Sequence, residues 1–401
     1  MKPIVTPLTV AIIMLCTFLI PACNNDNPEP STEIRVDSIY FAMNPMDIEF
    51  DTAEMKTIDK ALGEYIEAYR AYREIPLPNS VMPALQFNPL PRGFTIPPAT
   101  GPVPWSIPEG IQKPASPYDL AFMSIPELAA LLRSGQTTSL ELTQFFLNRL
   151  EESDPQLHCV VSFTEEYALE QARKLDEELA NGTDRGILHG IPYGIKDLFA
   201  FPGYTTTWGA EAYRDQVINT KAGVIEKLEG AGAVLIAKLT LGALAMGDVW
   251  FADTTRNPWN LEQGSSGSSA GSSAATAAGL VPFAIGTETY GSIVSPTTRC
   301  GVTGLRPTYG RVTRAGAMAL SWSMDKAGPI CRSAEECAIV FDAIRGTDEN
   351  DPTLYEAGFD YKPVNISDLR IGYYKSAFEE DYPFKKQDQQ TLRELKKLGA
   401  N

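Results

Sequence analysis

The first periodic segment of the chain covers residues 52–73 and predicts an amphipathic helix. Its apolar positions lie three or four residues apart and are Met55, Ile58, Leu62, Ile66 and Tyr69. Prolines crowd the sequence after this segment as far as residue 114. Because proline fixes φ and removes a backbone donor, neither a regular helix nor a sheet is expected there. We therefore expect residues 23–115 to form a proline-rich N-terminal extension with one helix, wrapped over the main domain.

The main domain is expected to span residues 116–401 and to alternate helices with strands. Ser124 with Glu127, and Thr138 with Glu141, have the spacing of capping boxes, so a helix begins at each pair. Helices over 165–180, 222–229 and 333–344 then alternate with strand-like segments, namely "IPYGIKD", "AVLIAKL", "PFAIG" and "LRIGYY". This alternation is typical of an α/β fold with a parallel or mixed sheet.

The end of the chain is informative because a predicted helix over 385–398 is followed by "GAN" and by no strand. In an α/β fold, a helix that ends at a glycine normally leads into the next strand. We therefore expect the C-terminal part of the domain to be missing from this chain.

The start of the chain has the pattern of an export signal over residues 1–22. Lys2 precedes an apolar run over 8–20, and "IPAC" ends at Cys23 before a polar segment. The run is too short for a comfortable membrane span. We expect an exported bacterial lipoprotein of the cell envelope that faces the periplasm or the outside, with Cys23 lipidated as its single membrane contact. A simple secretory signal or a tight anchor is the alternative, because Pro21 is not favoured beside a cleavage site.

Composition excludes several classes of function. The net charge is −16 and 44% of the residues are apolar, which is typical of an acidic globular protein, and no basic stripe suggests nucleic acid as a partner. Four cysteines remain after the signal and Cys23, too few for a disulfide scaffold, and we expect them to be small buried residues: Cys159, Cys300, Cys331 and Cys337. The two histidines, His158 and His189, do not support a zinc site.

A serine- and glycine-rich segment over 264–280, "GSSGSSAGSSAATAAGL", has the composition of a flexible linker. It continues, however, into an apolar strand-like segment, so its small residues indicate a close approach of the backbone to a neighbour or a ligand. "GSSAG" over 267–271 matches the G-x-S-x-G pattern of a nucleophile elbow, but no strand is expected before it and neither histidine is well placed as a base.

Lys196 is the remaining candidate base, since it stands at the end of an apolar strand. Burial would have to lower its pKa by roughly three units from the reference value of about 10.4. A solvated surface lysine is the alternative. The neighbouring Asp197 does not interfere, because adjacent strand residues point to opposite faces.

These segments together resemble the amidase signature hydrolases. The resemblance rests on "HGIPYGIKD", on "AVLIAKLTLGALAMG", "TRNPWN" and "SMDKAGPICRSAEECAIVFDAI", and on the core "GSSGSSAGSSAATAAGLVPFAIGTETYGSIVSPTTRCGVTGLRPTYGRV". It covers about residues 118–350 and implies a large mixed sheet covered by helices on both sides.

The resemblance also implies roles for individual residues. Ser292 would be the nucleophile, Ser268 a bridging serine that follows a cis Gly267–Ser268 bond, and Lys196 the base. The backbone N–H groups of an oxyanion hole would come from Thr289, Tyr290, Gly291 and Ser292. No metal or organic cofactor is expected.

The chain departs from the family pattern "GTDxGGSxR" at three positions, which here hold Glu288, Tyr290 and Val294. Without the family arginine, Glu288 needs another partner. Tyr290 would narrow or reshape the oxyanion loop if that backbone was built for glycine.

The function that the resemblance implies is hydrolysis of a carboxylic amide to an acid and an amine or ammonia, through an acyl-enzyme. The expected partner is a small-molecule amide, whose identity and the oligomeric state stay open. One alternative is the glutaminase subunit of a tRNA-dependent amidotransferase, against which the export signal argues. The other is an inactive, truncated remnant.

Overall fold

The computed structural model describes residues 49–96, 98, 103–362 and 364–400. The chain divides into two compact units, one that ends at Pro78 and one that begins at Asn79. The expected export signal over 1–22 and the lipidated Cys23 lie outside the described residues, and the boundary between residues 115 and 116 stays a prediction. Within the described ranges, no helix is long and apolar enough to cross a membrane.

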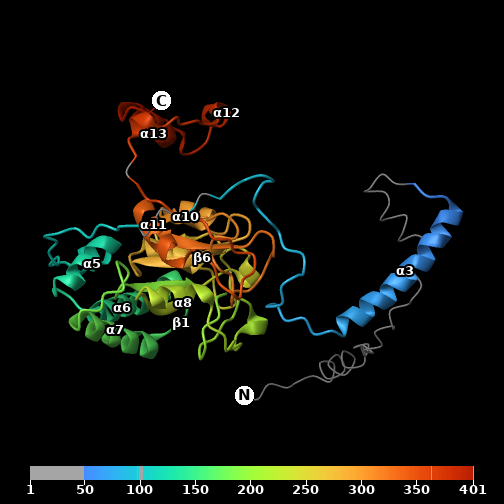
Figure 1. Ribbon diagram of the computed structural model, residues 1–401, viewed down its shortest axis with the longest axis horizontal. Helices are drawn as coiled ribbons and strands as arrows, with labels where there is room; N and C mark the ends of the chain where they lie inside the picture. Colours follow the sequence, from blue (N-terminus) through green and yellow to red (C-terminus); the bar gives the residue numbers. More distant parts are fainter. Residues whose placement is uncertain (1–48, 97, 99–102, 363, 401) are drawn as a thin grey trace, which may run out of the picture. The chain divides into compact units, whose positions relative to one another are not determined.

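The first unit contains helix α3, Thr52–Arg73 (Figure 1). Asp51 caps its N-terminus in a complete capping box, in which Glu54 returns a bond to the backbone of Asp51. Such a cap contributes about 1 kcal/mol to helix stability. Met55 lies buried on the apolar face. The helix predicted from the apolar spacing is confirmed with the predicted bounds.

The proline-rich segment that begins at Asn79 has irregular backbone wherever it is described, as its prolines predict. It lies against the larger unit through a few specific contacts. The side chain of Asn79 bonds to the N–H and C=O of Ala319, at 2.7 and 3.1 Å, and the Trp105 indole N–H donates to Asp342 at 3.0 Å. The segment that begins at Asn79 therefore contacts the rest of the larger unit at these points, and the predicted wrapping of residues 23–115 over the main domain stays a prediction.

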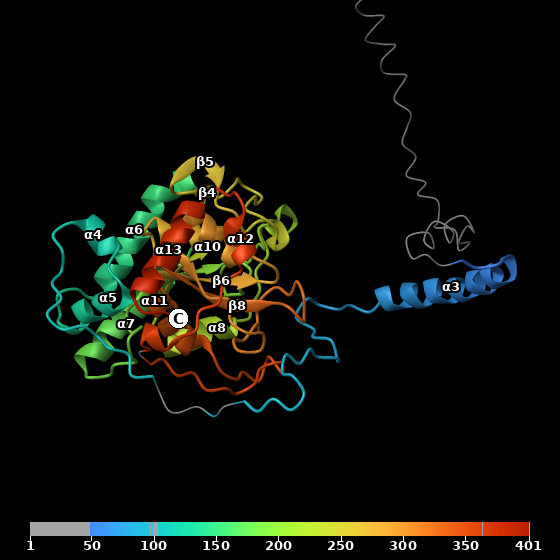
Figure 2. The same cartoon turned by 90° about the horizontal axis from the view of Figure 1, so that it is seen from above.

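A mixed sheet of six strands forms the centre of the larger unit (Figures 1 and 2). The strand order is β1-β3-β2-β6-β8-β7. The pairs β3/β2 and β2/β6 are parallel, and the pairs β1/β3, β6/β8 and β8/β7 are antiparallel. The strands are β1 Val160–Phe163, β2 Pro192–Lys196, β3 Val234–Leu239, β6 Phe283–Glu288, β7 Thr303–Gly304 and β8 Lys326–Cys331.

The central strands β2 and β3 are buried along their whole length. Both read as nearly continuous apolar runs, as expected for parallel strands covered on both faces. Ile195 of β2 is level with Ile285 of β6, so the carboxyl ends of these strands meet at one edge of the sheet. Lys196 and Thr287 therefore come close together at this edge.

Helices flank the sheet. The capping boxes predicted at Ser124 and Thr138, and the one at Ser333, are present, and each satisfies a backbone donor at the start of its helix. The helices of this part are α4 Pro117–Ala121, α5 Ile125–Arg133, α6 Ser139–Leu157, α7 Glu165–Ala180, α8 Gly223–Gly230, α9 Ala270–Ala277, α10 Val294–Cys300 and α11 Ala334–Ile344. The predicted α/β fold is confirmed.

One predicted strand is wrong. The segment 369–374, "LRIGYY", has irregular backbone and exposed side chains in the structure. Its apolar alternation is that of a strand, but a strand forms only where a neighbour takes up its backbone N–H and C=O groups. The helices that follow, α12 Lys375–Glu379 and α13 Lys385–Lys397, contain no buried residue.

Candidate active site

Lys196 is the last residue of β2, and its side chain is completely buried. Its Nζ is 2.8 Å from Ser268 Oγ, 2.9 Å from Thr287 Oγ1 and 3.2 Å from Ser269 Oγ. Thr287 belongs to the neighbouring strand β6, and the two serines lie in the serine-rich loop. The parallel pairing of β2 and β6 thus places the lysine amine within hydrogen-bond distance of three hydroxyl groups.

The hydrogen bonds around Nζ restrict how the N–H groups of the amine are oriented. Ser269 Oγ donates its proton to Thr287 O at 3.1 Å, so this oxygen can only accept from Lys196. A neutral lysine has two N–H donors and one lone pair. Thr287 O, at 3.4 Å, is a further acceptor, so a neutral amine that donates to Thr287 and Ser269 can turn its lone pair to the hydroxyl of Ser268.

Burial lowers the pKa of Lys196 from 10.5 to about 7, although the negative charges of Asp325 and Glu288 act in the opposite direction. Removal from water disfavours the charged form of an amine. A large share of Lys196 is therefore neutral near pH 7, as the sequence argument for a base requires.

The serine-rich loop is a close-approach segment and not a linker. A Cβ on Gly267 would lie 1.8 Å from the carbonyl oxygen of Gly247, and one on Gly286 would lie 2.6 Å from Ser269 Oγ. The peptide bond between Gly267 and Ser268 is cis, as the resemblance implies. Every residue of the following helix α9 is buried. Only residues without a large side chain fit between α9 and the sheet.

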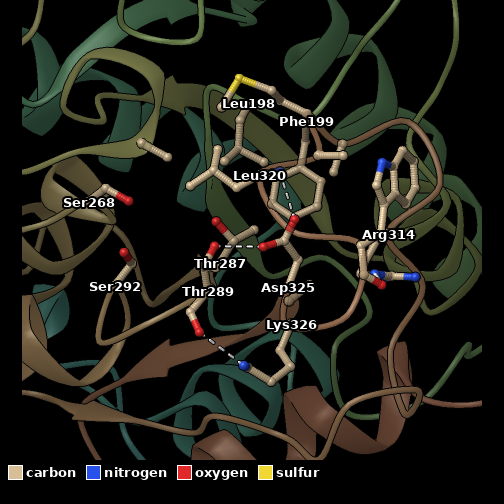
Figure 3. A pocket seen from close by; sticks show the side chains of 16 residues that line it. Leu198, Phe199, Ser268, Thr287, Thr289, Ser292, Arg314, Leu320, Asp325 and Lys326 are labelled. Atoms are coloured by element: carbon tan, nitrogen blue, oxygen red, sulfur yellow. Dashed lines mark hydrogen bonds between the residues drawn. The ribbon is translucent and has the colours of Figure 1, made fainter. Parts of the chain in front are cut away.

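A pocket opens beside this cluster, and both Ser268 and Ser292 line it (Figure 3). The two serine side chains lie together at one end of the pocket. The N–H of Ser269 donates to the carbonyl of Ser292 at 3.1 Å, which ties the two loops together. Apolar residues form much of the remaining wall: Leu198, Phe199, Ala245, Ala317, Met318, Leu320 and Trp322.

The loop expected to form the oxyanion hole runs from Thr289 to Ser292, directly after β6. Gly291 has φ +94°, a conformation that glycine adopts without strain. The side chain of Tyr290 is 90% exposed and does not line the pocket, so it does not narrow it. Figure 3 shows Thr289 between Asp325 and Lys326: its hydroxyl donates to Asp325 at 2.6 Å, and its carbonyl accepts from Lys326 at 3.2 Å.

Glu288, the last residue of β6, has the partner that the sequence left open. Its Oε1 accepts from Arg306 Nη1 at 2.9 Å, and its Oε2 accepts the backbone N–H groups of Ile293 and Val294 at 2.8 and 3.0 Å. Burial raises the pKa of Glu288, but these hydrogen bonds outweigh burial and hold the pKa below its ordinary value. Sequence reasoning missed Arg306, since nothing in its local pattern points to Glu288.

Asp197 points away from Lys196, as strand alternation predicts, and meets a second buried lysine. Its Oδ1 lies 2.7 Å from Nζ of Lys238, and both side chains are completely buried. The N–H groups of Lys238 donate to Thr205 O and Thr206 Oγ1, each at 2.6 Å. Asp197 Oδ2 accepts from the backbone and hydroxyl of Thr207. The sequence did not reveal this pair.

The histidines lie apart from the candidate site. His189 accepts from the N–H of Arg185 and bonds to Leu175 O, and His158 lies 3.5 Å from Asp253. A short strand, β5 Asn260–Gly264, pairs with β4, Arg256–Asn257, but it ends before Ser265 and Ser266, so no strand leads directly into "GSSAG". A nucleophile elbow is therefore disfavoured here.

The four cysteines expected to be buried are buried and unpaired. In the described part of the chain, no cluster of three or more His, Cys, Asp or Glu side chains is arranged to hold a metal ion.

A protein-family model described as Amidase matches residues 141–401. Among curated proteins, a glutamyl-tRNA(Gln) amidotransferase subunit from Methylococcus capsulatus is 44% identical over 264 residues, which cover 64% of this chain and 54% of that protein. The protein of the same name from Marinomonas sp. is 41% identical over 286 residues, covering 69% and 59%. The chain thus spans somewhat more than half the length of these relatives.

Solved structures agree with this match. A peptide amidase in complex with the competitive inhibitor chymostatin has a TM-score of 0.65 at 33% identity, over 71% of this chain and 62% of that one. An amidase family protein from Bacillus anthracis also has a TM-score of 0.65, at 29% identity, over 71% and 60%. The family model, the fold and the strand-end site agree, and the chain belongs to the amidase (amidase signature) family.

Proposed function

We propose that the protein hydrolyses a carboxylic amide, with Ser292 as nucleophile, Ser268 as bridging serine and Lys196 as base. The observation that carries the proposal is the buried Lys196, whose Nζ lies 2.8 Å from Ser268 Oγ beside the pocket that holds Ser292. A weak nucleophile such as a serine hydroxyl needs an adjacent base of this kind.

In the acylation step, Lys196 takes the proton of Ser268 while Ser268 takes the proton of Ser292. The oxygen of Ser292 forms a bond to the amide carbonyl carbon, and a tetrahedral intermediate results. The N–H groups of Thr289, Tyr290, Gly291 and Ser292 stabilise its oxyanion, because donors held in advance cost no reorganisation.

The C–N bond then breaks, and the proton held by Lys196 returns through Ser268 to the leaving nitrogen. The acyl group stays on Ser292 as an ester. Water enters, loses a proton through the same relay, and releases the acid. Every proton that the lysine takes is returned, so the enzyme ends each cycle in its starting state.

Labelling with a fluorophosphonate tests this relay without knowledge of the substrate. Ser292 Oγ bonds to phosphorus and fluoride leaves, so intact mass reports one adduct per chain. We expect wild type to be labelled and Ser292→Ala to be unlabelled. A folded wild-type chain that takes up no label would contradict the proposal and favour the remnant.

The names of the curated relatives support a second candidate more directly than they support a general amidase. We propose as this candidate a glutaminase subunit that hydrolyses glutamine and works with the partner subunits of an amidotransferase. The support is 40–44% identity to several proteins named as glutamyl-tRNA(Gln) amidotransferase subunits.

A matched substrate comparison separates the two candidates. Ammonia release is measured from glutamine and from a panel of amides with apolar acyl groups, with Ser292→Ala as blank. Turnover of glutamine that rises when amidotransferase partner subunits are added supports the glutaminase. Turnover of the other amides, with none of glutamine, supports the general amidase.

Export would also distinguish the two candidates. A tRNA-dependent amidotransferase serves translation, which takes place in the cytoplasm, so an exported chain does not fit that role. We propose that residues 1–22 direct export and that Cys23 carries a lipid, on the support of the sequence pattern alone. Expression of the full chain with Cys23→Ala as control tests this: the wild type should partition with membranes and show the mass of a lipid, and the variant should not. A cytoplasmic, unprocessed wild type would contradict export and favour the glutaminase.

A further inference from the structure

The carboxylate of Glu288 contacts the backbone of the loop that carries Ser292. Glu288 is completely buried, and one of its oxygens accepts the N–H groups of the two residues that follow Ser292, Ile293 and Val294. The same loop is fixed at its other end, where Thr289 bonds to Asp325 and Lys326. Glu288 therefore determines where the C-terminal half of the loop lies.

The other oxygen of Glu288 pairs with a positively charged side chain from outside the loop. Arg306 follows β7, and its Nη1 donates to Glu288 Oε1 at 2.9 Å. The arginine side chain is 53% exposed, whereas the carboxylate is 0% exposed. The half-exposed guanidinium of Arg306 thus pairs with the buried carboxylate of Glu288. In the family pattern an arginine stands at the position that Val294 occupies in this chain.

We propose that Arg306 is a positioning residue for the nucleophile: through Glu288 it holds the loop from Thr289 to Val294 in the geometry that aims Ser292 and the oxyanion N–H groups. This inference rests on the proposed hydrolysis at Ser292. Arg306 takes the place of the guanidinium that position 294 lacks.

The physical reason is the cost of a buried charge. A buried carboxylate keeps its charge only when charge and hydrogen bonds compensate its removal from water. Without Arg306, the pKa of Glu288 would rise. A protonated carboxyl group accepts hydrogen bonds less strongly, so Ile293 and Val294 would be held less firmly.

Two lysines also face Glu288 from the neighbouring strands. Lys326 of β8 is its register partner, and Lys196 of β2 lies at the same edge of the sheet. Lys326 donates to the carbonyls of Thr289 and Met324, so it holds the opposite end of the loop. Neither lysine contacts the oxygen that Arg306 serves.

The test measures fluorophosphonate labelling of the full 401-residue chain as a function of probe concentration and pH, which separates the maximal rate from the probe affinity. The variants are Arg306→Ala, Arg306→Lys, and Arg306→Ala combined with Val294→Arg. Arg299→Ala is the matched control, because it removes an exposed positive charge from the adjacent helix α10. Thermal unfolding of each variant reports folding.

We expect Arg306→Ala to lower the maximal labelling rate by about 10- to 100-fold, the effect of a displaced reacting group, and to change probe affinity little. A second fall in rate, at the pH where Glu288 becomes protonated, appears below the limb that Lys196 sets near pH 7, since the pKa of Glu288 rises. Arg306→Lys keeps most of the rate. Val294→Arg restores part of the loss, because the N–H of residue 294 already bonds to Glu288 at 3.0 Å.

The outcomes distinguish the inference from the proposed function. If wild type is labelled and Arg306→Ala is labelled equally fast with the same pH profile, the inference fails and the proposed function stands. Equal losses in Arg306→Ala and Arg299→Ala also overturn the inference, because loss of net charge would then explain both. If wild type takes up no label, the proposed function itself fails.

Discussion

Two fully buried lysines stand on adjacent strands of the sheet, and their surroundings differ. Lys238 on β3 lies 2.7 Å from the carboxylate of Asp197, whereas Lys196 on β2 is surrounded by hydroxyl and carbonyl oxygens. Burial lowers the pKa of both. For Lys238 the charge of Asp197 opposes this shift at close range, whereas Lys196 forms no ion pair of this kind with any described residue.

The comparison shows that burial alone does not make a base. A lysine with a carboxylate partner keeps its proton and holds structure together, here the segment around Thr205 and Thr206. A lysine whose neighbours are uncharged acceptors loses its proton near neutral pH and has a lone pair to offer. The four predictions below test this difference, from the largest expected effect to the smallest.

Removal of the proposed base should have the largest effect. Lys196→Met is expected to slow fluorophosphonate labelling by about 10²- to 10⁴-fold, which is the usual contribution of a general base. The chain should still fold, because removing the burial cost of the amine offsets the loss of its hydrogen bonds to Ser268, Ser269 and Thr287. Retained labelling at the wild-type rate would refute the role of Lys196.

The same substitution at the other lysine should instead affect stability. Lys238→Met leaves Asp197 as a buried charge without its cation, and we expect a loss of about 3–5 kcal/mol in the free energy of unfolding. Chemical denaturation measures it. The double variant Asp197→Asn with Lys238→Met should recover much of the loss, and a single variant as stable as wild type would contradict the ionic pair.

A carboxylate placed beside Lys196 should make it resemble Lys238. In wild type the labelling rate should rise with pH through about 7, since the protonated lysine cannot accept the proton of Ser268. Thr287→Asp is expected to move this limb up by about 1–3 units, because a nearby anion stabilises the ammonium form. Thr287→Asn, uncharged and of similar size, should leave the limb near its wild-type position.

Matched removal of one hydroxyl acceptor from each lysine should give the smallest effects. Thr206→Val removes a hydrogen bond from Lys238, which pairs with a carboxylate, and should cost about 1.5–3 kcal/mol if that lysine is charged. Thr287→Val removes one from Lys196 and should cost about 0.5–1.5 kcal/mol above pH 7, where that lysine is mostly neutral. Denaturant midpoints measure both. A reversed order would show that the charges are assigned to the wrong lysines.

Much of the fold could be predicted from local pattern. Capping boxes place the starts of α5, α6 and α11, and apolar runs identify β2, β3 and β6, because both signals depend on residues close in sequence. The segment 369–374 shows the limit of such reasoning. Its alternation is correct for a strand, but a strand exists only when another strand lies beside it.

The sequence by itself pointed to Lys196, because a lysine at the end of an apolar strand is a local signal, and to a close approach at the serine-rich loop, because its residues are small. The resemblance to a family named Ser268 and Ser292 and implied a cis bond before Ser268. The structure contains that cis bond and places Ser268 Oγ 2.8 Å from Lys196 Nζ.

Only the tertiary structure decided what surrounds these residues. The pairings of Glu288 with Arg306, of Asp197 with Lys238, and of Thr289 with Asp325 and Lys326 join segments that are distant in sequence. No local pattern encodes them, because they depend on which strands lie side by side and on how deeply each charge is buried. The pKa of Lys196 follows from the same cause, since only the packed sheet removes it from water.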